Sequence, residues 1–412
     1  MKKLISVLLV AVMLFAFAGC AGTNGGADDF KVGLIFLHDE NSTYDLNFIN
    51  AAKEAAKKLG LRDDQVIMKY NVPEDGSYCY DAAADLADRG CDVIFADSFG
   101  HEDNMIVAAK EFKNVQFCHA TGTKAHTEKL SNYHNAFASI YEGRYLAGVA
   151  AGLKLNEMIA AGKFDAKDAK MGYVGAYTYA EVISGYTAFF LGAKSVCPTV
   201  TMDVQFTGSW YDEALEKEAA ELLIKKGAKL LSQHADSMGA PTACETAKVP
   251  NVSYNGSTVK ACPNTFIVSS RIDWAPYLEY IFTCAKEGKK IDEDWCKGIV
   301  DGSVKLTEVN ETVAAKDTQK TIDEVKAKLA DGSVKVFDVK NFTVTVTDKV
   351  NPNAKVDGDG HLTSYMADVD TDEAYAPDTE AVKDGYFHES EYRSAPYFDL
   401  RIDGITTLNE KF

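Results

Sequence analysis

The sequence predicts an α/β protein made of two lobes, each a doubly wound parallel sheet. Short apolar runs of strand length alternate with longer segments in which apolar residues recur every three or four positions, the helical pattern. The alternation runs from residue 31 to about 138 and starts again at 170, after one helix of small residues. Alternating strands and helices favour a parallel sheet covered on both faces, and two consecutive units of similar length indicate two lobes.

The first unit begins with an apolar strand at 31–37, followed by a loop at 38–43. The helix at 45–60 carries its apolar residues on one stripe and ends at Gly60, a residue suited to a helix C-terminus. At the centre of the unit, 91–122 has the length of a complete βαβ crossover. The other elements expected here are strands at 65–70, 92–96, 115–118 and 135–138 and helices at 77–89 and 103–112.

The second unit follows a helix at 141–155 whose small residues should let it pack closely. Its expected strands are 170–174, 201–206, 229–233, 251–254 and 266–269, and its helices are 180–194, 213–226, 241–248 and 273–288. Beyond Trp295 the pattern weakens. There we expect a helix at 321–329, strands at 333–338 and 343–346, and an aromatic segment at 348–412 docked on the rest.

The first 20 residues have the features of a signal peptide and not of the fold. Lys2 and Lys3 precede an apolar stretch, 5–18, that is too short for a comfortable transmembrane helix. The segment ends Phe17-Ala18-Gly19-Cys20, which resembles a bacterial lipobox and makes Cys20 the expected lipidation site and mature N-terminus. An ordinary secretory signal with a chance cysteine is the alternative. The polar, Gly-rich residues 21–30 suit a flexible tether.

The charge of the chain argues against nucleic acid as a partner. The formal net charge is -18, and removing the two lysines of the signal peptide takes it to about -20 by subtraction. A surface with this much negative charge repels nucleic acid and anionic lipid headgroups. We therefore expect acyl chains, and not charge, to hold the protein to a membrane. The eight cysteines other than Cys20 show no C-x-x-C spacing, which disfavours a zinc or redox site. Mostly free thiols are expected, with one or two disulfides as the alternative.

Motifs of catalysis are missing from the sequence. It has no G-x-S-x-G elbow, Walker loop, H-E-x-x-H or G-x-G-x-x-G. Asp368, Asp370 and Asp372 have the first spacings of a calcium loop, but Glu373 stands where that loop needs Gly. We therefore expect a binding protein without catalytic residues, bound metal or cofactor.

The expected place for a ligand is the rim where parallel strands end. Ligands of open parallel sheets bind beyond the carboxyl ends of the strands. The loops 97–102 and 119–123 both follow strands of the first unit, so they come out on the same rim.

Several stretches together resemble the basic membrane protein family. They are CDVIFADSFGHEDNMIVAAKEFKNVQFCHATG, IYEGRYLAGVAAG, KMGYVGAYTYAEVISGYTAFFLGAKSV, GSWYDEALEKEAAELLIKKGAKLLSQHADS and, near the end, SAPYFDLRIDGITTLNEK. The resemblance covers the chain from about Lys31 onward. It implies a lipid-anchored substrate-binding component of an ABC importer, related to a purine nucleoside receptor. The implied fold is the type I periplasmic binding protein, with two α/β lobes joined by a three-segment hinge.

On this fold, lobe 1 is expected to comprise 31–138 and about 271–300, and lobe 2 to comprise 139–270 and about 301–412, including a C-terminal extension. The family pocket holds a purine between two aromatic rings. The matching residues are Tyr44, in the run Ser42 to Asn47, and Trp210, in the run Gly208 to Asp212. Ser42 stands where relatives carry a Trp-like neighbour. A half-buried aromatic side chain at a strand end is the alternative for each ring.

Further ligand contacts implied by the resemblance and the rim are Asn47, Phe99, Thr121, Asp236, Asn255 and Trp274. In nucleoside-binding relatives the position of Asn255 is an Asp that grips the ribose hydroxyls, assisted by a Lys near 273–274. Here the Asp has become an amide and the Lys is missing. Because a carboxylate accepts two hydroxyl hydrogen bonds and Asn offers one acceptor, we expect a free purine base or an unusual nucleoside.

The function implied is capture of a purine, closure of the lobes and delivery to permease and ATPase subunits. The protein is expected to be an extracytoplasmic monomer attached to the cell membrane through its lipid alone. Two alternatives use the same cleft: a sensor domain that feeds a signalling partner, and a binder of another small molecule such as a sugar. An enzyme acting on purine nucleosides is a third alternative.

Overall fold

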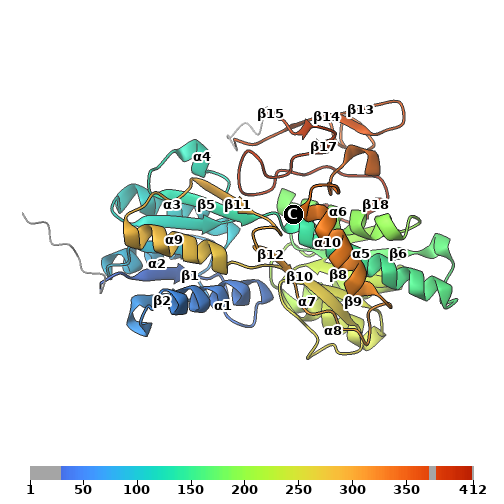
Figure 1. The fold of residues 1–412 in the computed structure, drawn as a ribbon, viewed down its shortest axis with the longest axis horizontal. Coiled ribbons are helices and arrows are strands. Elements are labelled where there is room, and N and C mark those ends of the chain that lie inside the picture. The colour runs from blue at the N-terminus through green and yellow to red at the C-terminus, as the bar shows by residue number, and fades with distance from the viewer. Residues whose placement is uncertain (1–28, 371–376, 411–412) are drawn as a thin grey trace, which may run out of the picture.

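The computed structural model describes residues 29–370 and 377–410. The signal peptide, Cys20, nearly all of the tether and Asp372 lie outside these residues. Two sheets covered by helices lie side by side, and a smaller layer from the C-terminal part of the chain lies over them, drawn in orange and red at the top of Figure 1. Within the described ranges, every helix is too short or too polar to cross a bilayer.

The first sheet has six strands, all parallel, in the order β2-β1-β3-β4-β5-β11. Its apolar strands β1 and β3 are buried along their whole length, as strands covered on both faces must be. We call this part lobe 1. Its strands are β1 (Val32–Ile35), β2 (Val66–Lys69), β3 (Val93–Ala96), β4 (Gln116–Ala120), β5 (Tyr133–Ala138) and β11 (Asp294–Lys297), and its helices are α1 (Thr43–Lys58), α2 (Tyr78–Asp88), α3 (Glu102–Glu111), α4 (Ala125–Glu128) and α9 (Ala275–Glu287).

The second sheet has seven strands in the order β12-β10-β9-β8-β6-β7-β18, parallel except where β12 pairs with β10. We call this part lobe 2. Its strands are β6 (Lys170–Gly175), β7 (Thr201–Phe206), β8 (Leu230–His234), β9 (Asn251–Tyr254), β10 (Phe266–Ile272), β12 (Val304–Leu306) and β18 (Ile405–Thr407), and its helices are α5 (Ile140–Ala160), α6 (Ala180–Val196), α7 (Glu213–Lys225), α8 (Gly239–Ala247) and α10 (Thr318–Ala330).

The two lobes share one topology. In lobe 1 the order β2-β1-β3-β4-β5, and in lobe 2 the order β7-β6-β8-β9-β10, follow the same doubly wound scheme. The chain passes between the sheets after β5, after β10 and after β11, which gives a hinge of three segments. The residue limits expected for each lobe stay a prediction.

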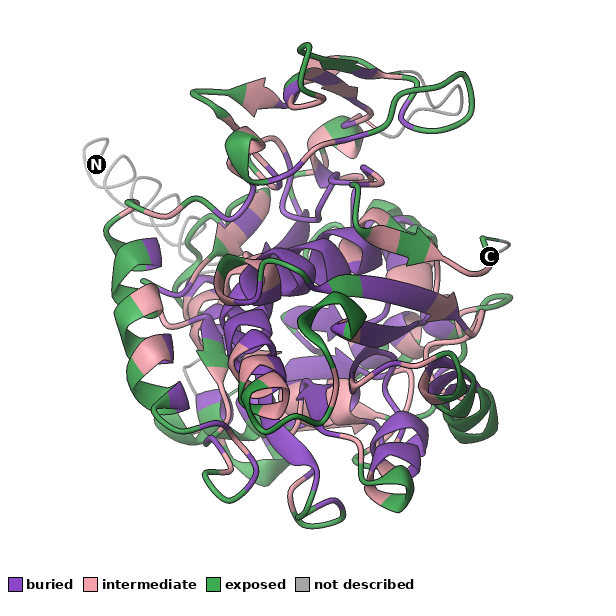
Figure 2. Cartoon of the chain, turned by 90° about the vertical axis from the view of Figure 1, so that its right-hand side faces the viewer, coloured by how far each residue is buried: buried purple, intermediate pink, exposed green. Residues whose placement is uncertain are grey.

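Helices α5 and α6 pack closely, as their small residues predict. A side chain at Gly148 would collide with the backbone of Phe189, and one at Gly192 would collide with the backbone of Tyr145. Both helices are buried along most of their length. Figure 2 shows the central strands and the inner helix faces mostly buried, with the exposed residues on outer helix faces, loops and parts of the extension.

The C-terminal extension is docked, as its aromatic residues predict. It adds the short antiparallel strands β13 (Ala354–Val356), β14 (Leu362–Ala367), β15 (Thr379–Glu380), β16 (Val382–Lys383) and β17 (Tyr386–Phe387). Tyr365 and Phe398 are buried in it. The extension touches both lobes: Ser394 donates from its backbone N and its Oγ to Asp294 of β11 (2.9 and 2.8 Å), and Ser184 of α6 donates to Glu389 (2.5 Å).

The strands predicted at 333–338 and 343–346 are wrong. In the first segment the sequence neighbours Val336 and Phe337 are both buried, and the pairing is an isolated bridge from Asp338 to Tyr386. In the second segment Val344 is buried and Val346 is exposed. That segment is held by the Oγ1 atoms of Thr343 and Thr345, which donate to the carboxylate of Asp403 (2.7 and 2.9 Å), and by the backbone N of Val344, which donates to the Gly360 carbonyl (2.9 Å).

Candidate ligand-binding site

Loops from both sheets meet at a cavity between the lobes. Side chains from both lobes line this cavity. It lies where parallel strands of both lobes end, the place expected for this architecture. Lobe 1 contributes Leu37, Tyr44, Ser98, Phe99 and Thr121, and lobe 2 contributes Glu181, Trp210, His234, Asp236 and Tyr254.

Tyr44 is presented by the first turn of α1. Ser42 caps that helix, because its Oγ accepts from the backbone N of Asp45 (3.2 Å) while it donates to the Asp45 carboxylate (2.6 Å). The Tyr44 hydroxyl donates to the backbone carbonyl of Asp97 (2.7 Å), and its ring packs edge-on against Phe48 (5.0 Å). The ring is thus fixed at its base and at its tip.

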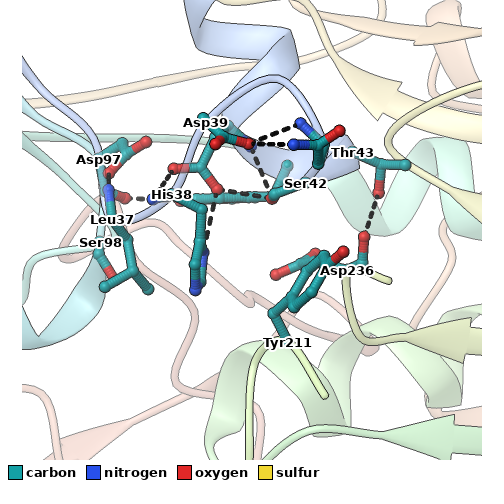
Figure 3. Close-up of polar contacts among 12 residues, drawn as sticks. Leu37, His38, Asp39, Ser42, Thr43, Asp97, Ser98, Tyr211 and Asp236 are labelled. Carbon is teal, nitrogen blue, oxygen red and sulfur yellow. Dashed lines mark hydrogen bonds and ion pairs between the residues drawn. The ribbon is translucent and has the colours of Figure 1, made fainter. Parts of the chain in front are cut away.

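The first residue of α1 and the loop before it also join the two lobes. Figure 3 shows Thr43 directed at Asp236, and both its backbone N and its Oγ1 donate to the Asp236 carbonyl at 3.3 Å. The ring of His38 lies 5.3 Å from that of Tyr211, across the same boundary. On another side of the cavity Phe99 stacks on Tyr179 at 4.9 Å. These contacts hold the lobes together around the cavity.

Trp210 comes from the loop after β7. Its half-buried ring meets the edge of Tyr177 at 5.1 Å and lies 6.0 Å from Tyr179. Its carbonyl accepts from the backbone N of Asp236 (2.9 Å), and Asp212 caps the helix that follows by accepting from Leu215 (2.9 Å). The indole is therefore held in the cavity wall by its backbone and its neighbours.

The polar wall of the cavity favours uncharged groups. Burial raises the pKa of Glu181 to about 8. Burial, helped by the nearby carboxylate of Asp45, also raises the pKa of Asp236. Burial lowers the pKa of His234, and the charge of Arg144 adds to that effect. Near neutral pH the wall thus offers the protonated carboxyl of Glu181 and a neutral imidazole.

Arg144 supports this wall from behind. Its guanidinium is fully buried, lies 4.3 Å from the centre of the Tyr254 ring and 5.2 Å from that of Tyr173, and donates to the carbonyl of Gln233 (2.7 Å). Burial lowers the pKa of Arg144 to about 10. The tyrosine faces thus take the place of a counter-ion.

The structure brings five of the predicted ligand contacts together in the cavity lining: Tyr44, Phe99, Thr121, Trp210 and Asp236. Asn255 lies one hydrogen bond behind the lining residue Asp236, and Asn47 lies two behind it. Asn47 Nδ2 donates to Asn255 Oδ1 (3.3 Å), and Asn255 Nδ2 donates to Asp236 Oδ1 (3.5 Å). Trp274 lies in the core of lobe 1, 1 % exposed and stacked on Phe48 at 4.4 Å. Trp274 therefore supports the ring of Phe48, which in turn packs against Tyr44. The ligand contacts themselves stay predictions.

Two of these residues have left-handed backbone conformations. Thr121 has φ 67° and Asn255 has φ 64°. For a β-branched residue this conformation is rare, and a strained residue costs about 1–3 kcal/mol, so the fold must hold Thr121 in place. Its backbone N donates to the Ala136 carbonyl (3.0 Å), which anchors it at the end of β4.

Sequence reasoning missed Glu181, His234, Ser98, Leu37 and Tyr254 in the lining. The signal was present for Glu181, because the loop after β6 reaches the same rim as the loops that were considered. His234 and Tyr254 are the last residues of β8 and β9. Their side chains alternate across the sheet, and only the structure shows which face meets lobe 1.

One acidic cluster lies in the extension, away from the cavity. Carboxylate oxygens of Asp368, Asp370 and Asp378 all lie within 4.8 Å of one another. Asp378 is exposed and accepts from the backbone N of Val369 (3.2 Å). Exposed acidic groups often gather without an ion, so we assign no metal site to them.

Two lobes of parallel sheet, joined by three segments and lining one cavity together, define a solute-binding protein with the type I periplasmic binding protein fold. Residues 34–336 match the family described as ABC transporter substrate-binding protein PnrA-like, and the chain belongs to that family. Proteins of this family are extracytoplasmic and deliver their ligand to the permease and ATPase of an ABC transporter.

The chain is similar to several named binding proteins. A purine-binding protein of Brucella abortus is 29% identical over 334 residues, which is 80% of this chain and 89% of that protein. A protein of Haloferax volcanii named as an ABC transporter glucose-binding protein is 28% identical over 68% of this chain and 70% of its own. An ABC transporter solute-binding protein of Conexibacter woesei has a TM-score of 0.59 at 22% identity, covering 74% of this chain and 98% of that one, which shows the shared fold.

Proposed function

We propose that this chain captures a purine in the cavity between its lobes, as the lipid-anchored solute-binding component of an ABC importer. The observation that carries the proposal is the position of Tyr44 and Trp210, which come from opposite lobes and line the same cavity together with Asp236. A flat heterocycle can stack on such rings, at about 1–3 kcal/mol per base, while polar groups meet its edge. The purine-binding relative from Brucella abortus supports the same class of ligand.

Within that class a free base is favoured over a ribonucleoside. Asn255 stands where nucleoside-binding relatives are expected to carry an acid for the ribose hydroxyls. Here its amide already accepts from Asn47 and donates to Asp236 (3.3 and 3.5 Å). An amide engaged in this way has little left to offer a diol.

Delivery follows from closure. Contacts such as Thr43 to Asp236 form only when the lobes meet, so a ligand that touches both lobes shifts the hinge equilibrium toward the closed arrangement. The permease then recognises that arrangement. The lipid on Cys20 keeps the protein, acting as a monomer, at the outer side of the cell membrane.

The test is isothermal titration calorimetry of the purified mature protein. The ligand set is hypoxanthine, guanine and adenine, their ribonucleosides, and glucose. We expect at least one base to bind with a lower Kd than its nucleoside. Glucose binding without any purine binding would replace this proposal with the sugar alternative, which the Haloferax volcanii relative favours. If a nucleoside binds with a far lower Kd than its base, the preference for free bases is refuted and purine capture is not. Mass spectrometry of the molecule that co-purifies gives an independent answer.

A further inference from the structure

One carboxyl in the cavity wall has only a weak partner. Glu181 lies in the first turn of α6, and its side chain is 11 % exposed. Its hydrogen-bond partner among the described residues is His234, whose Nε2 lies 3.4 Å from Oε1, a long contact. A nearly buried carboxyl that is poorly hydrogen-bonded costs free energy, which a ligand bonded to it would recover.

His234 fixes the direction of that carboxyl. Its ring packs on Tyr254 at 4.5 Å, and Tyr254 in turn lies on the guanidinium of Arg144. The imidazole therefore has a rigid backing. Because its Nε2 lies 3.4 Å from Oε1, it engages one lone pair of that oxygen, so Oε2 and the other lone pair of Oε1 remain for a ligand in the cavity, which Glu181 lines.

The charges of the lining are one-sided. It contains two carboxyls, Glu181 and Asp236, and neither Lys nor Arg. Arg144 lies beneath Tyr254 and is not part of the lining. An anionic ligand would meet a desolvated acidic wall without a counter-ion, so its binding is penalised.

We propose that the Glu181 carboxyl, protonated and braced by His234, hydrogen-bonds the edge of the ligand and selects uncharged heterocycles over anionic ones. This inference rests on the proposed function and names the ligand class for the same cavity. A protonated carboxyl has one O–H donor beside one C=O acceptor. It can donate to O6 and accept from N1–H of a 6-oxopurine, or donate to N1 and accept from the amino group of adenine. A carboxylate has no donor and can make neither pair.

Burial accounts for the protonated form, since it raises the pKa of Glu181 to about 8. The ionisable groups around Glu181 do not oppose this. Asp236 and Tyr254 of lobe 2, Tyr44 of lobe 1 and Glu389 of the extension are all neutral or negative, and His234 is neutral because burial lowers its pKa. Among the described residues, three arginines lie near this part of the cavity. Arg144 is turned toward the tyrosine rings. Arg393 and Arg401 line an adjoining pocket with Glu181, where Arg393 donates to backbone carbonyls of the extension and Arg401 donates to the Tyr186 hydroxyl.

The test compares two substitutions by calorimetry. Glu181→Gln keeps a donor beside an acceptor, and Glu181→Leu keeps the size and removes both. With hypoxanthine, or whichever purine base the parent binds best, we expect the Gln variant to bind within about threefold of the parent. We expect the Leu variant to be at least about tenfold weaker, the loss of two buried hydrogen bonds. Thermal melts check that each variant is folded.

The pH dependence adds an independent readout. Between about pH 6 and 7 the affinities of parent and Gln variant should stay in constant ratio. Above about pH 8 the parent should lose up to about tenfold per pH unit relative to the Gln variant, because only the parent loses its donor. Taking the ratio cancels any ionisation of the ligand. A flat ratio would contradict a protonated Glu181.

Urate, an anion near neutral pH, completes the experiment on the unaltered protein. We expect it to bind at least about tenfold more weakly than hypoxanthine. Equal binding of urate, or a Leu variant as tight as the parent, overturns the inference while leaving purine capture intact. If the Leu variant does not fold, the urate comparison and the pH ratio decide. A parent that binds no purine at all overturns the proposed function and this inference together.

Discussion

Replacing Trp210 with Ala is the most direct perturbation of the cavity. The indole is half-buried and is held by Tyr177 at 5.1 Å and Tyr179 at 6.0 Å, so its loss removes one wall and leaves the loop backbone in place. Stacking of a base on an aromatic side chain is worth about 1–3 kcal/mol. The midpoint, about 2 kcal/mol, corresponds to a Kd about 30-fold higher, since each 1.4 kcal/mol is about tenfold.

The assay for Trp210→Ala is calorimetry with the purine base that the parent binds best. Trp210→Phe should show a smaller loss, because a ring face remains. Tyr78→Ala is the matched control, since Tyr78 is an aromatic residue 58% exposed at the start of α2 and outside the cavity lining. If Trp210→Ala binds the base as tightly as the parent, or if the Tyr78 control loses as much, the stacking argument fails.

Two further predictions concern stability and the membrane. Burial raises the pKa of Glu389 to about 7, so the folded state binds that proton more tightly than the unfolded chain does. Stability should therefore fall by up to about 3 kcal/mol as pH rises from about 4.5 to about 7 and then level off, and Glu389→Gln should remove that part of the slope in urea denaturation curves. A slope that Glu389→Gln leaves unchanged contradicts this. Cys20→Ser should move the protein from the membrane to the soluble fraction, whereas the control Cys296→Ser should not; a membrane-bound Cys20→Ser would argue against acylation.

Most of the fold could be predicted from the sequence because the patterns that indicate its strands and helices are local. Strands such as β1 and β3 are buried on both faces, so each shows as one apolar run. Helices such as α1 show a stripe and an end signal, although α1 begins at Thr43 and not at the expected residue 45. The two expected units appear as two sheets with one strand order, because strands joined by helical crossovers favour parallel pairing.

The C-terminal third was harder because its pairing is not local. β18 has three residues and pairs in parallel with β7, about 200 positions earlier in the chain, so nothing near it in sequence announces a partner. The opposite error arose at 343–346, which looked like a strand but is held by side-chain bonds to Asp403 and a backbone bond to Gly360. Val344 is buried and Val346 is exposed, so these residues alone do not specify a strand, and the partner decides whether a sheet forms.

The sequence predicted where the site lies but only some of the residues that line it. The rim rule and the family resemblance led to Tyr44, Phe99 and Trp210, which all line the cavity. They also led to Trp274, which the structure places in the core, because an aromatic residue at the hinge fits a core as well as a pocket. Sequence spacing cannot say which of two apolar surroundings a ring faces.

Glu181 illustrates a stronger limit of sequence reasoning. In the sequence it is one acidic residue near a helix start, where carboxylates are common because they favour the helix dipole. Its character in the structure comes from residues far away in the chain, since His234, Tyr254 and the extension surround it and exclude water. An opened cleft would admit water and let this carboxyl ionise. Closure, neutralisation of Glu181 and rejection of anions are therefore one event in this cavity, because the same contacts that join the lobes remove the solvent that a charge needs.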